Sequence, residues 1–340
     1  VYRHIFEDIL AVPVIPGKKT KREQFAGAMS TSTIETFIAS SGRAIQAATA
    51  HCLGQNFAKI YGVEFENKTG GREYAWQNSW GLTTRAIGVV ILTHGDDRGL
   101  VLPPNIAPIQ VVVVPIPPRK TKNDPTTPTA EEILASAQRI KETIQQMNYR
   151  GSVVRVKLDD DLSRTPGWKY NYWELHGVPL RVEIGPRDVH NNTAVIVRRD
   201  SGKRSVVQLS DVESSIEDQL RDMQRDLLHR ATETLHSRIR KTLNPTEFKK
   251  ALEDRCVALV PWCGEDDAEE VIRKLSMSAP SVATTPTDQT EFPGETSTLL
   301  TGIAKSLCIP FDQPDMPPGT KCLGKPERLA RKWVLFARSY

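Results

Sequence analysis

The clearest pattern of hydrophobic positions lies in the middle of the chain. Short β-branched or apolar runs predict strands at residues 109–114, 153–156, 178–184 and 193–197. Between the first two runs, Thr129 and Glu132 have the spacing of a capping box. An apolar stripe at helical spacing follows them: Ile133, Leu134, Ala137, Ile140, Ile144 and Met147. A strand, a helix and a strand in this order predict a parallel pair joined by a right-handed crossover.

The first hundred residues carry several different patterns. Apolar residues recur at helical spacing from Ile5 to Leu10, so we expect the chain to begin inside a helix of a domain whose earlier part is absent. Small and apolar residues at 42–60 predict a second helix. Residues 74–80 alternate as in a strand, and residues 83–92 predict a helix that ends near a Gly-Asp turn. Paired prolines at 103–104 end this part, because neither a helix nor a central strand continues through them.

The last part of the chain combines a long helix with short strands. Ser210 and Glu213 form a second capping-box pair ahead of an apolar stripe that reaches residue 239. Residues 306–311 and 333–336 predict strands. We expect three parts, 1–104, 105–208 and 209–340, with a disordered insertion at about 276–300 that is rich in Ser, Thr and Pro.

Composition narrows the class of protein only moderately. Lys and Arg number 45 and Asp and Glu 41, a net charge of +4 that does not by itself demand a nucleic-acid partner. No apolar run approaches the length needed to cross a bilayer, which excludes a membrane-spanning protein. The five cysteines are odd in number and scattered, which favours a reducing compartment, and we expect the cytoplasm.

Two clusters place polar side chains among small residues, at 46–51 and at 79–85. Small residues leave room for a ligand, Gln46 and Thr49 offer hydrogen bonds, and the planar fork of Arg85 suits a phosphate. Each feature also has a plainer interpretation. Arg85 would then belong to a solvated helix start, and His51 would be a histidine of the protein core.

Several long motifs resemble prolyl-tRNA synthetases of the eukaryotic and archaeal type, which are class II aminoacyl-tRNA synthetases. They are GRAIQAATAHCLGQNFAKIYGVEF (42–65), NSWGLTTRAIG (78–88), HGDDRGLVLPP (94–104), GWKYNYWELHGVPLRVEIGPRD (167–188) and the terminal FARSY (336–340). The resemblance extends over the whole chain apart from two variable loops. No glycine-rich phosphate loop supports an unrelated nucleotide-binding protein.

The resemblance implies a proline–tRNA ligase. ATP, with Mg²⁺, activates L-proline to prolyl-adenylate, and the prolyl group then moves to tRNA(Pro). Such catalysis depends on positioning the proline carboxylate against the α-phosphate of ATP and on stabilising the negative charge of the transition state. Arg85 matches the motif 3 arginine and is the expected catalytic residue. The implied ATP-binding residues are Gln46, Thr49, Thr83 and Arg85, and the implied proline-binding residues are His51, Trp80 and Gly81.

The middle part resembles the anticodon-binding domain of class IIa synthetases. Glu174, Arg181 and Arg187 match positions that read the anticodon guanines in the family. The chemistry is suitable, because a carboxylate accepts from guanine N1–H and N2–H whereas arginine donates to O6 and N7. Four nearby aromatic residues offer surfaces on which bases stack, although strand-like alternation would bury about half of them: Trp168, Tyr170, Tyr172 and Trp173.

The last part resembles a family domain that binds structural zinc through four cysteines in many members. Cys263 and Cys322 match the first cysteine of each pair and are remnants of that site. Ala268 and Gly324 stand where the second cysteines would be. Tetrahedral zinc needs four deprotonated ligands, so we expect no metal in this domain.

The expected fold class is α/β with an α+β catalytic part. It comprises the C-terminal part of the class II antiparallel-sheet core, an anticodon-binding domain with a mixed sheet, and a small C-terminal α/β domain. The family's motifs 1 and 2 are not found in the 340 residues, so we expect this chain to be inactive alone. The resemblance also implies that the intact enzyme is a homodimer. The alternative is a non-catalytic tRNA-binding or regulatory protein on a synthetase scaffold.

Overall fold

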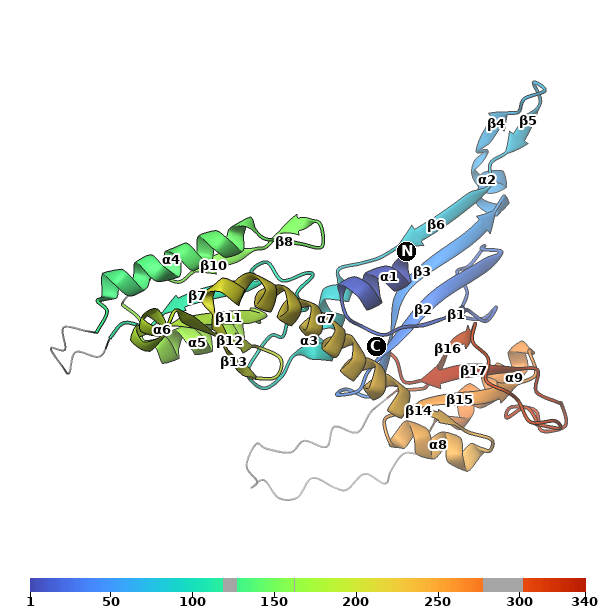
Figure 1. The fold of residues 1–340 in the computed structure, drawn as a ribbon. Helices are drawn as coiled ribbons and strands as arrows, with labels where there is room; N and C mark the ends of the chain where they lie inside the picture. Colours follow the sequence, from blue (N-terminus) through green and yellow to red (C-terminus); the bar gives the residue numbers. More distant parts are fainter. Residues whose placement is uncertain (119–126, 162, 278–301) are drawn as a thin grey trace, which may run out of the picture. The chain divides into compact units, whose positions relative to one another are not determined.

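The computed structural model describes residues 1–118, 127–161, 163–277 and 302–340 (Figure 1). The chain divides into two compact units. Unit 1 comprises residues 1–3, 13–89 and 232–340, and unit 2 comprises residues 4–12 and 90–231. Each unit combines helices with a large sheet, which confirms the predicted α/β class. No helix in the described ranges has both the length and the apolar character needed to cross a membrane.

Unit 2 is built on a mixed sheet of five strands in the order β10-β7-β11-β12-β13. The strands are β7 (Val111–Pro115), β10 (Val156–Leu158), β11 (Leu180–Ile184), β12 (Thr193–Arg198) and β13 (Arg204–Gln208). β10 and β11 flank β7 and are parallel to it, whereas β12 pairs antiparallel with β11, and β13 pairs antiparallel with β12. The predicted parallel crossover is thus confirmed. The strand expected at 153–156 is displaced, because β9 (Ser152–Val153) forms a hairpin with β8 (Asn148–Tyr149) before β10 begins.

Helices cover both faces of this sheet, which explains why β7 is apolar throughout. α4 (Ala130–Gln146) begins with the predicted capping box at Thr129, and its buried stripe packs with Val111 and Val113. The first turns of α7 (Val212–Ser237) contribute to the same core. Val112 and Val114 pack on the other side with Trp173 of α5 (Pro166–Leu175). A 3₁₀ turn (Leu209–Asp211) precedes α7, so the helix begins one residue later than the second capping-box pair indicated.

Unit 1 contains an eight-stranded sheet in the order β14-β15-β17-β16-β1-β2-β3-β6. Four strands come from the start of the chain: β1 (Ile15–Lys18), β2 (Ser30–Ile38), β3 (Arg43–Gly54) and β6 (Gln77–Gly81). Four come from its end: β14 (Ile239–Lys241), β15 (Val257–Trp262), β16 (Lys305–Pro310) and β17 (Lys332–Ala337). β1 and β16 pair antiparallel at Gly17 and Pro310 and so join the two sets. The strands predicted at 306–311 and 333–336 are confirmed.

The helix predicted for residues 42–60 is wrong. Residues 43–54 form β3, the longest strand, and only α2 (Asn56–Tyr61) is helical. β3 pairs with β2 on one side and β6 on the other. Two partner strands satisfy its backbone groups, and this tertiary pairing outweighs the local preference of a run of small residues.

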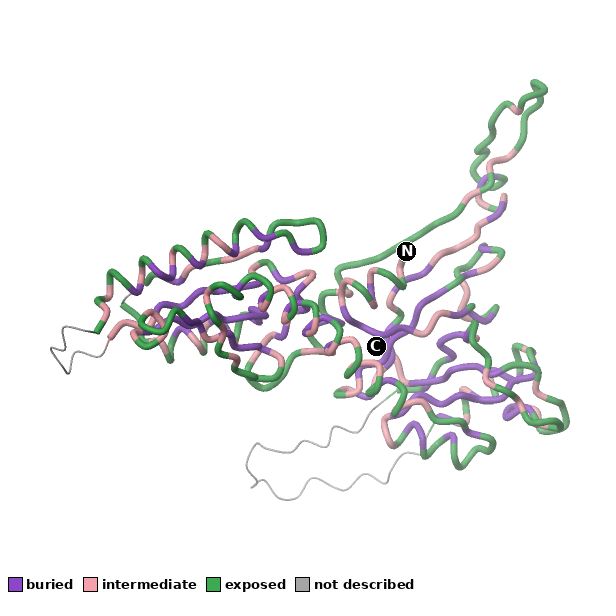
Figure 2. Tube along the Cα trace, viewed as in Figure 1, coloured by how far each residue is buried: buried purple, intermediate pink, exposed green. Residues whose placement is uncertain are grey.

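The remaining described elements are short helices and one hairpin. The chain begins with α1 (Tyr2–His4) and a π-helix (Ile5–Ile9), and α3 (Arg85–His94) confirms the helix expected at 83–92. α8 (Pro245–Glu253) and α9 (Asp266–Leu275) pack on the strands from the end of the chain. The hairpin of β4 (Glu64–Glu66) and β5 (Arg72–Tyr74) is mostly exposed (Figure 2). The insertion expected at 276–300 lies, from residue 278 onward, outside the described residues.

The junction of β1 and β16 leads to a testable prediction. A Cβ added at Gly17 would lie 2.6 Å from both the Cys308 sulfur and the Ile309 carbonyl oxygen. We therefore expect Gly17→Ala to lower the free energy of unfolding by about 1–3 kcal/mol, the usual cost of overpacking a close contact. Urea denaturation followed by circular dichroism measures the change.

Gly88→Ala is the matched control, since its Cβ would meet no atom within 4 Å and its position is helical. Alanine there should be neutral or stabilising by up to about 1 kcal/mol. Equal stability of Gly17→Ala and the wild type would contradict the close approach at this junction.

Candidate functional site

The register of β2, β3 and β6 brings several of the predicted adenylate residues onto one face of the unit 1 sheet. Thr49 lies opposite Gly81 of β6, and His51 lies opposite Thr31 of β2. Directly opposed residues in an antiparallel pair share a face, and residues two apart on one strand do too. Thr49, His51 and Gly81 therefore lie on the same face.

An irregularity in the ladder places Gln46 on this face as well. Gln46 is three residues before Thr49, which in a regular strand would put the two side chains on opposite faces. Between Ile34 and Glu35 of β2 the register shifts, so that Glu35 pairs with Gln46 while Ile34 pairs with Ala48. The extra residue of this β-bulge shifts the alternation of side chains by one position, so Gln46 and Thr49 lie on the same face. Gln46 is exposed there.

Both ring nitrogens of His51 contact threonine hydroxyls. Its Nδ1 lies 2.9 Å from Oγ1 of Thr31, and its Nε2 lies 3.1 Å from Oγ1 of Thr49. The Phe25 ring packs against the imidazole with 4.9 Å between centroids. Partial burial lowers the pKa of His51, because removal from water disfavours the charged imidazolium. The ring is therefore neutral near pH 7.

The other residues expected at this site are more exposed. Trp80 pairs with Ala50, so alternation puts its side chain on the face opposite His51, where it is 74% exposed. Arg85 is the first residue of α3, and its backbone N–H donates to Oγ1 of Thr83 at 3.3 Å. The Arg85 guanidinium is exposed and has no ion-pair partner among the described residues. It is thus available to a phosphate.

A buried polar row continues this face toward the β1–β16 junction, and sequence analysis did not find it. Thr33 donates to Oε1 of Glu35 at 2.7 Å, and the Lys19 amine pairs with the same oxygen at 2.7 Å. Lys19 also donates to the carbonyl of Leu307 in β16. Burial raises the pKa of Glu35, although Lys19 opposes this effect. The alternating Thr and Glu of β2 were the available signal, but only the register shows that they face inward.

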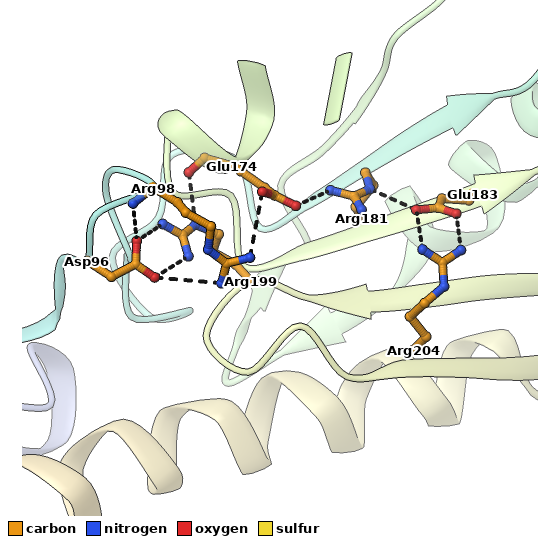
Figure 3. A network of polar contacts seen from close by, with 7 residues as sticks. All are labelled: Asp96, Arg98, Glu174, Arg181, Glu183, Arg199 and Arg204. Atoms are coloured by element: carbon orange, nitrogen blue, oxygen red, sulfur yellow. Dashed lines mark hydrogen bonds and ion pairs between the residues drawn. The ribbon is translucent and has the colours of Figure 1, made fainter. Parts of the chain in front are cut away.

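Unit 2 brings two of the three expected anticodon readers into direct contact. Nη1 of Arg181 in β11 donates to Oε1 of Glu174 in α5 at 3.0 Å (Figure 3). The Nε of Arg181 donates to Glu183 at 3.0 Å, and its guanidinium lies 4.0 Å from the ring centre of Tyr170. Burial, with Glu183 adding to it, raises the pKa of Tyr170 to about 12. Nη2 of Arg204 donates to the other carboxylate oxygen of Glu183 at 2.5 Å.

A second arginine fixes the end of α5 that carries Glu174. The Nε of Arg199 donates to the backbone carbonyl of Glu174 at 2.9 Å, and its two Nη atoms form a bidentate pair with Asp96 at 2.6 and 2.8 Å. Arg98 lies 3.8 Å from the second carboxylate oxygen of Glu174 (Figure 3). The network thus combines four arginines with three carboxylates. The string HGDDR drew attention to residues 94–98, but nothing in it indicated a contact with α5.

The third expected reader and the nearby aromatic residues have different positions. Arg187 is exposed on α6 (Pro186–Asn191), beyond the far end of β11, and contacts neither Glu174 nor Arg181 within the described ranges. Trp173 is buried and donates to Asp159 at 2.7 Å, so it belongs to the core. Trp168 is 44% exposed and stacks on Tyr172 with 5.1 Å between centroids.

The four positions that correspond to a family zinc site come together in unit 1, but they do not suit a metal. Cys263 and Cys322 are buried in one core cluster with Ala268. A Cβ at Gly324 would lie 2.2 Å from the Ala268 carbonyl oxygen, so a ligating side chain has no room there. No group of three or more potential ligands is placed to hold a metal ion in the ranges that the structure covers. Two thiols supply half of a tetrahedral set.

The Asp96–Arg199 pair generates a prediction about pH. Hydrogen bonds from Arg199 hold the pKa of Asp96 at about 2, below its usual value near 4. A depressed folded-state pKa adds stability above the unfolded pKa, and this stability is lost as pH falls toward the folded pKa. Asp96→Asn should cost about 1 kcal/mol at pH 7, because the carboxylate is partly exposed and screened. The difference from the wild type should shrink between pH 4 and pH 2.

Denaturation of wild type and variant at several pH values measures this dependence. Asp97→Asn is the matched control, since Asp97 is exposed and adjacent in sequence. A cost for Asp96→Asn that does not change with pH would rule out the ion pair as its source.

Comparison with known proteins relates two parts of the chain to family models and the whole chain to named relatives. Residues 245–340 match the family model described as "Prolyl-tRNA synthetase, C-terminal", and residues 110–219 match "Anticodon binding domain". The "Proline--tRNA ligase, cytoplasmic" of Arabidopsis thaliana is 40% identical over 346 residues, covering 100% of this chain and 58% of the relative. The "Proline--tRNA ligase" of Clostridium botulinum (strain Okra / Type B1) is 36% identical, with 100% and 62% covered.

A longer relative contains the same region within a bifunctional protein. The "Bifunctional glutamate/proline--tRNA ligase" of Mus musculus is 43% identical over 344 residues, which are 100% of this chain and 21% of the relative. The chain therefore spans about three fifths or less of the length of these relatives. Matches over the whole chain, together with the two family models, support a C-terminal portion of a prolyl-tRNA synthetase.

Proposed function

We propose that the protein acts in proline–tRNA ligation, in which proline and ATP form prolyl-adenylate and the prolyl group passes to tRNA(Pro). The observation that carries this proposal is the alignment of the entire chain, at 36–43% identity, with proteins named as proline–tRNA ligases. The "cytoplasmic" name of the Arabidopsis relative supports the same compartment for this chain. A homodimer, as in the intact family enzyme, is part of the proposal.

Unit 2 is the proposed anticodon-binding part. Glu174 offers a carboxylate to guanine N1–H and N2–H, and the Nη2 group of Arg181, which has no partner among the described residues, offers a donor to O6 or N7. Arg187 is proposed as a third contact from a separate element. Tyr170 under Arg181 and the ion pairs around both readers hold them in place before a base arrives.

The polar face of unit 1 is the proposed adenylate site. Gln46 and Thr49 would hold the adenosine and ribose of ATP, His51 and Gly81 would line the proline pocket, and Thr83 would support Arg85 through its helix start. Arg85 would bind the phosphates with its planar fork and stabilise the charge that develops during adenylate formation. Trp80 is left out of this proposed pocket, because it lies on the opposite face of β6.

Recognition of tRNA is tested by filter binding of the 340-residue chain to tRNA(Pro) at two salt concentrations. We expect affinity to fall at the higher salt, since cations on the protein displace counterions from phosphate. Glu174→Gln should weaken binding by about 10- to 100-fold, the effect of about 1–3 kcal/mol for one base contact. Arg139→Gln, an exposed change on α4, should leave affinity within about twofold.

A tRNA whose anticodon guanines are replaced by inosine, which lacks the N2 amino group, refines this test. Wild type should lose affinity for it, and Glu174→Gln should lose little more. If the losses of binding free energy from Glu174→Gln and from inosine were fully additive, Glu174 would not be the residue that contacts the guanine amino group.

Catalysis is tested by proline-dependent ATP–pyrophosphate exchange with an Arg85→Ala control. The chain covers 58% of the Arabidopsis relative, and motifs 1 and 2 of the family are not found in it. We therefore expect tRNA binding without exchange. Exchange that Arg85→Ala abolishes would instead mean that the 340 residues complete the adenylate site. The same measurement is then made on the chain joined to the upstream region of a relative. If this longer chain also catalyses no exchange, the result would favour the non-catalytic tRNA-binding alternative.

A further inference from the structure

We propose that Thr31 is a positioning residue that fixes His51 as its Nε2–H tautomer, and so directs the hydroxyl hydrogen of Thr49 toward an acceptor oxygen of the bound substrate. Thr31 lies in β2, outside the motifs that resemble the family. The substrate part of this inference rests on the proposed function. The tautomer part does not, because it follows from hydrogen bonds within unit 1.

The hydrogen bonds of Thr31 determine which way its hydroxyl points. The residue is 1% exposed, and its Oγ1 accepts the backbone N–H of Phe25 at 3.3 Å. The same oxygen lies 2.9 Å from Nδ1 of His51. If Nδ1 also donated to it, the hydroxyl hydrogen would have no acceptor in a buried place, which is unfavourable. Thr31 therefore donates to Nδ1.

This donation fixes the imidazole. Neutral histidine carries one proton, so an Nδ1 that accepts leaves the proton on Nε2. Partial burial lowers the pKa of His51 and keeps the ring neutral. Nε2 lies 3.1 Å from Oγ1 of Thr49, to which it donates. The Phe25 ring, 4.9 Å from the imidazole, limits its rotation.

The oxygen of Thr49 is thus occupied as an acceptor, while its own hydrogen remains free. Thr49 is 9% exposed, and His51 is its one side-chain hydrogen-bond partner among the described residues. Opposite Thr49 stands Gly81, where an added Cβ would meet no atom within 4 Å. A substrate oxygen can approach through this opening. Both a nucleotide sugar and an amino-acid carboxylate present such an oxygen.

The tautomer is measured by NMR of the 340-residue chain with ¹⁵N-labelled histidine, using His51→Asn to assign the signals. Protonated and unprotonated ring nitrogens differ strongly in ¹⁵N shift, so the two tautomers are distinct. We expect a single Nε2–H form in wild type and in Thr31→Ser, which keeps the hydroxyl. Thr31→Val should lose this preference and show an averaged or Nδ1–H form.

A wild-type Nδ1–H form, or an unchanged Nε2–H form in Thr31→Val, would overturn the positioning role. Circular dichroism checks that each variant is folded, and Thr31→Ser keeps the test valid if Thr31→Val is not. Neither outcome depends on catalysis.

The substrate part is tested by calorimetric titration with ATP alone and with proline alone. Thr31→Val and Thr49→Val should each weaken the same ligand by about tenfold, the effect of one lost hydrogen bond. Gly81→Ala should weaken it too while leaving the His51 tautomer unchanged. Weakening of ATP identifies the sugar as the acceptor, and weakening of proline identifies the carboxylate.

Unchanged affinity in Thr49→Val would refute the substrate part. A wild-type chain that keeps the Nε2–H tautomer but binds neither ligand would support the positioning role and refute the proposed substrate site.

Discussion

The antiparallel pairing of β1 with β16 is the contact on which unit 1 depends. It joins the strands of residues 15–81 and the strands of residues 239–337 into one sheet, and it requires a residue without a side chain at Gly17, where Cys308 and the Ile309 carbonyl approach closely. The buried Lys19–Glu35 pair lies beside this junction and bonds across it to Leu307. A buried ion pair contributes little net stability unless its remaining hydrogen bonds are satisfied, and here Thr33 and the Leu307 carbonyl satisfy them. The face that carries Thr49 and His51 therefore extends from this junction in the middle of the sheet.

Periodicity predicted those elements whose packing is local, and failed where a distant partner decides. The capping box at Thr129 and the apolar run of β7 were recognised from the sequence. A helix with one apolar stripe and a strand buried on both faces each produce a simple pattern of apolar residues. β3 was not, because its small residues suit a helix equally well until β2 and β6 pair with it. Motifs named the candidate residues, but only the bulge beside Glu35 explains why Gln46 shares a face with Thr49. The separation of Arg187 from Glu174 and Arg181 likewise depends on where β11 ends.

The charged network of unit 2 differs in kind from the polar face of unit 1. Glu174 and Arg181 already pair with each other, so under the proposed function a guanine would compete with this contact for Glu174 while it binds Nη2 of Arg181. The cost of that exchange falls if the surrounding groups stay fixed, and Arg199 and Glu183 hold the backbone and the side chain respectively. Under the proposed function such a site would discriminate strongly, because a base that does not replace the lost hydrogen bond leaves the buried Arg181 guanidinium with one partner fewer.

The order of strands in the unit 1 sheet has a consequence for biosynthesis. β1, β2, β3 and β6 leave the ribosome before unit 2 does, but the neighbour of β1 in the finished sheet, β16, emerges more than 200 residues later. Meanwhile unit 2, apart from residues 4–12, is contiguous in sequence and can complete its own sheet. During that interval the open edge of β1 presents unpaired backbone groups, the usual starting point for misassembly. We expect nascent chains that pause before β16 to need a chaperone more than chains that pause within unit 2.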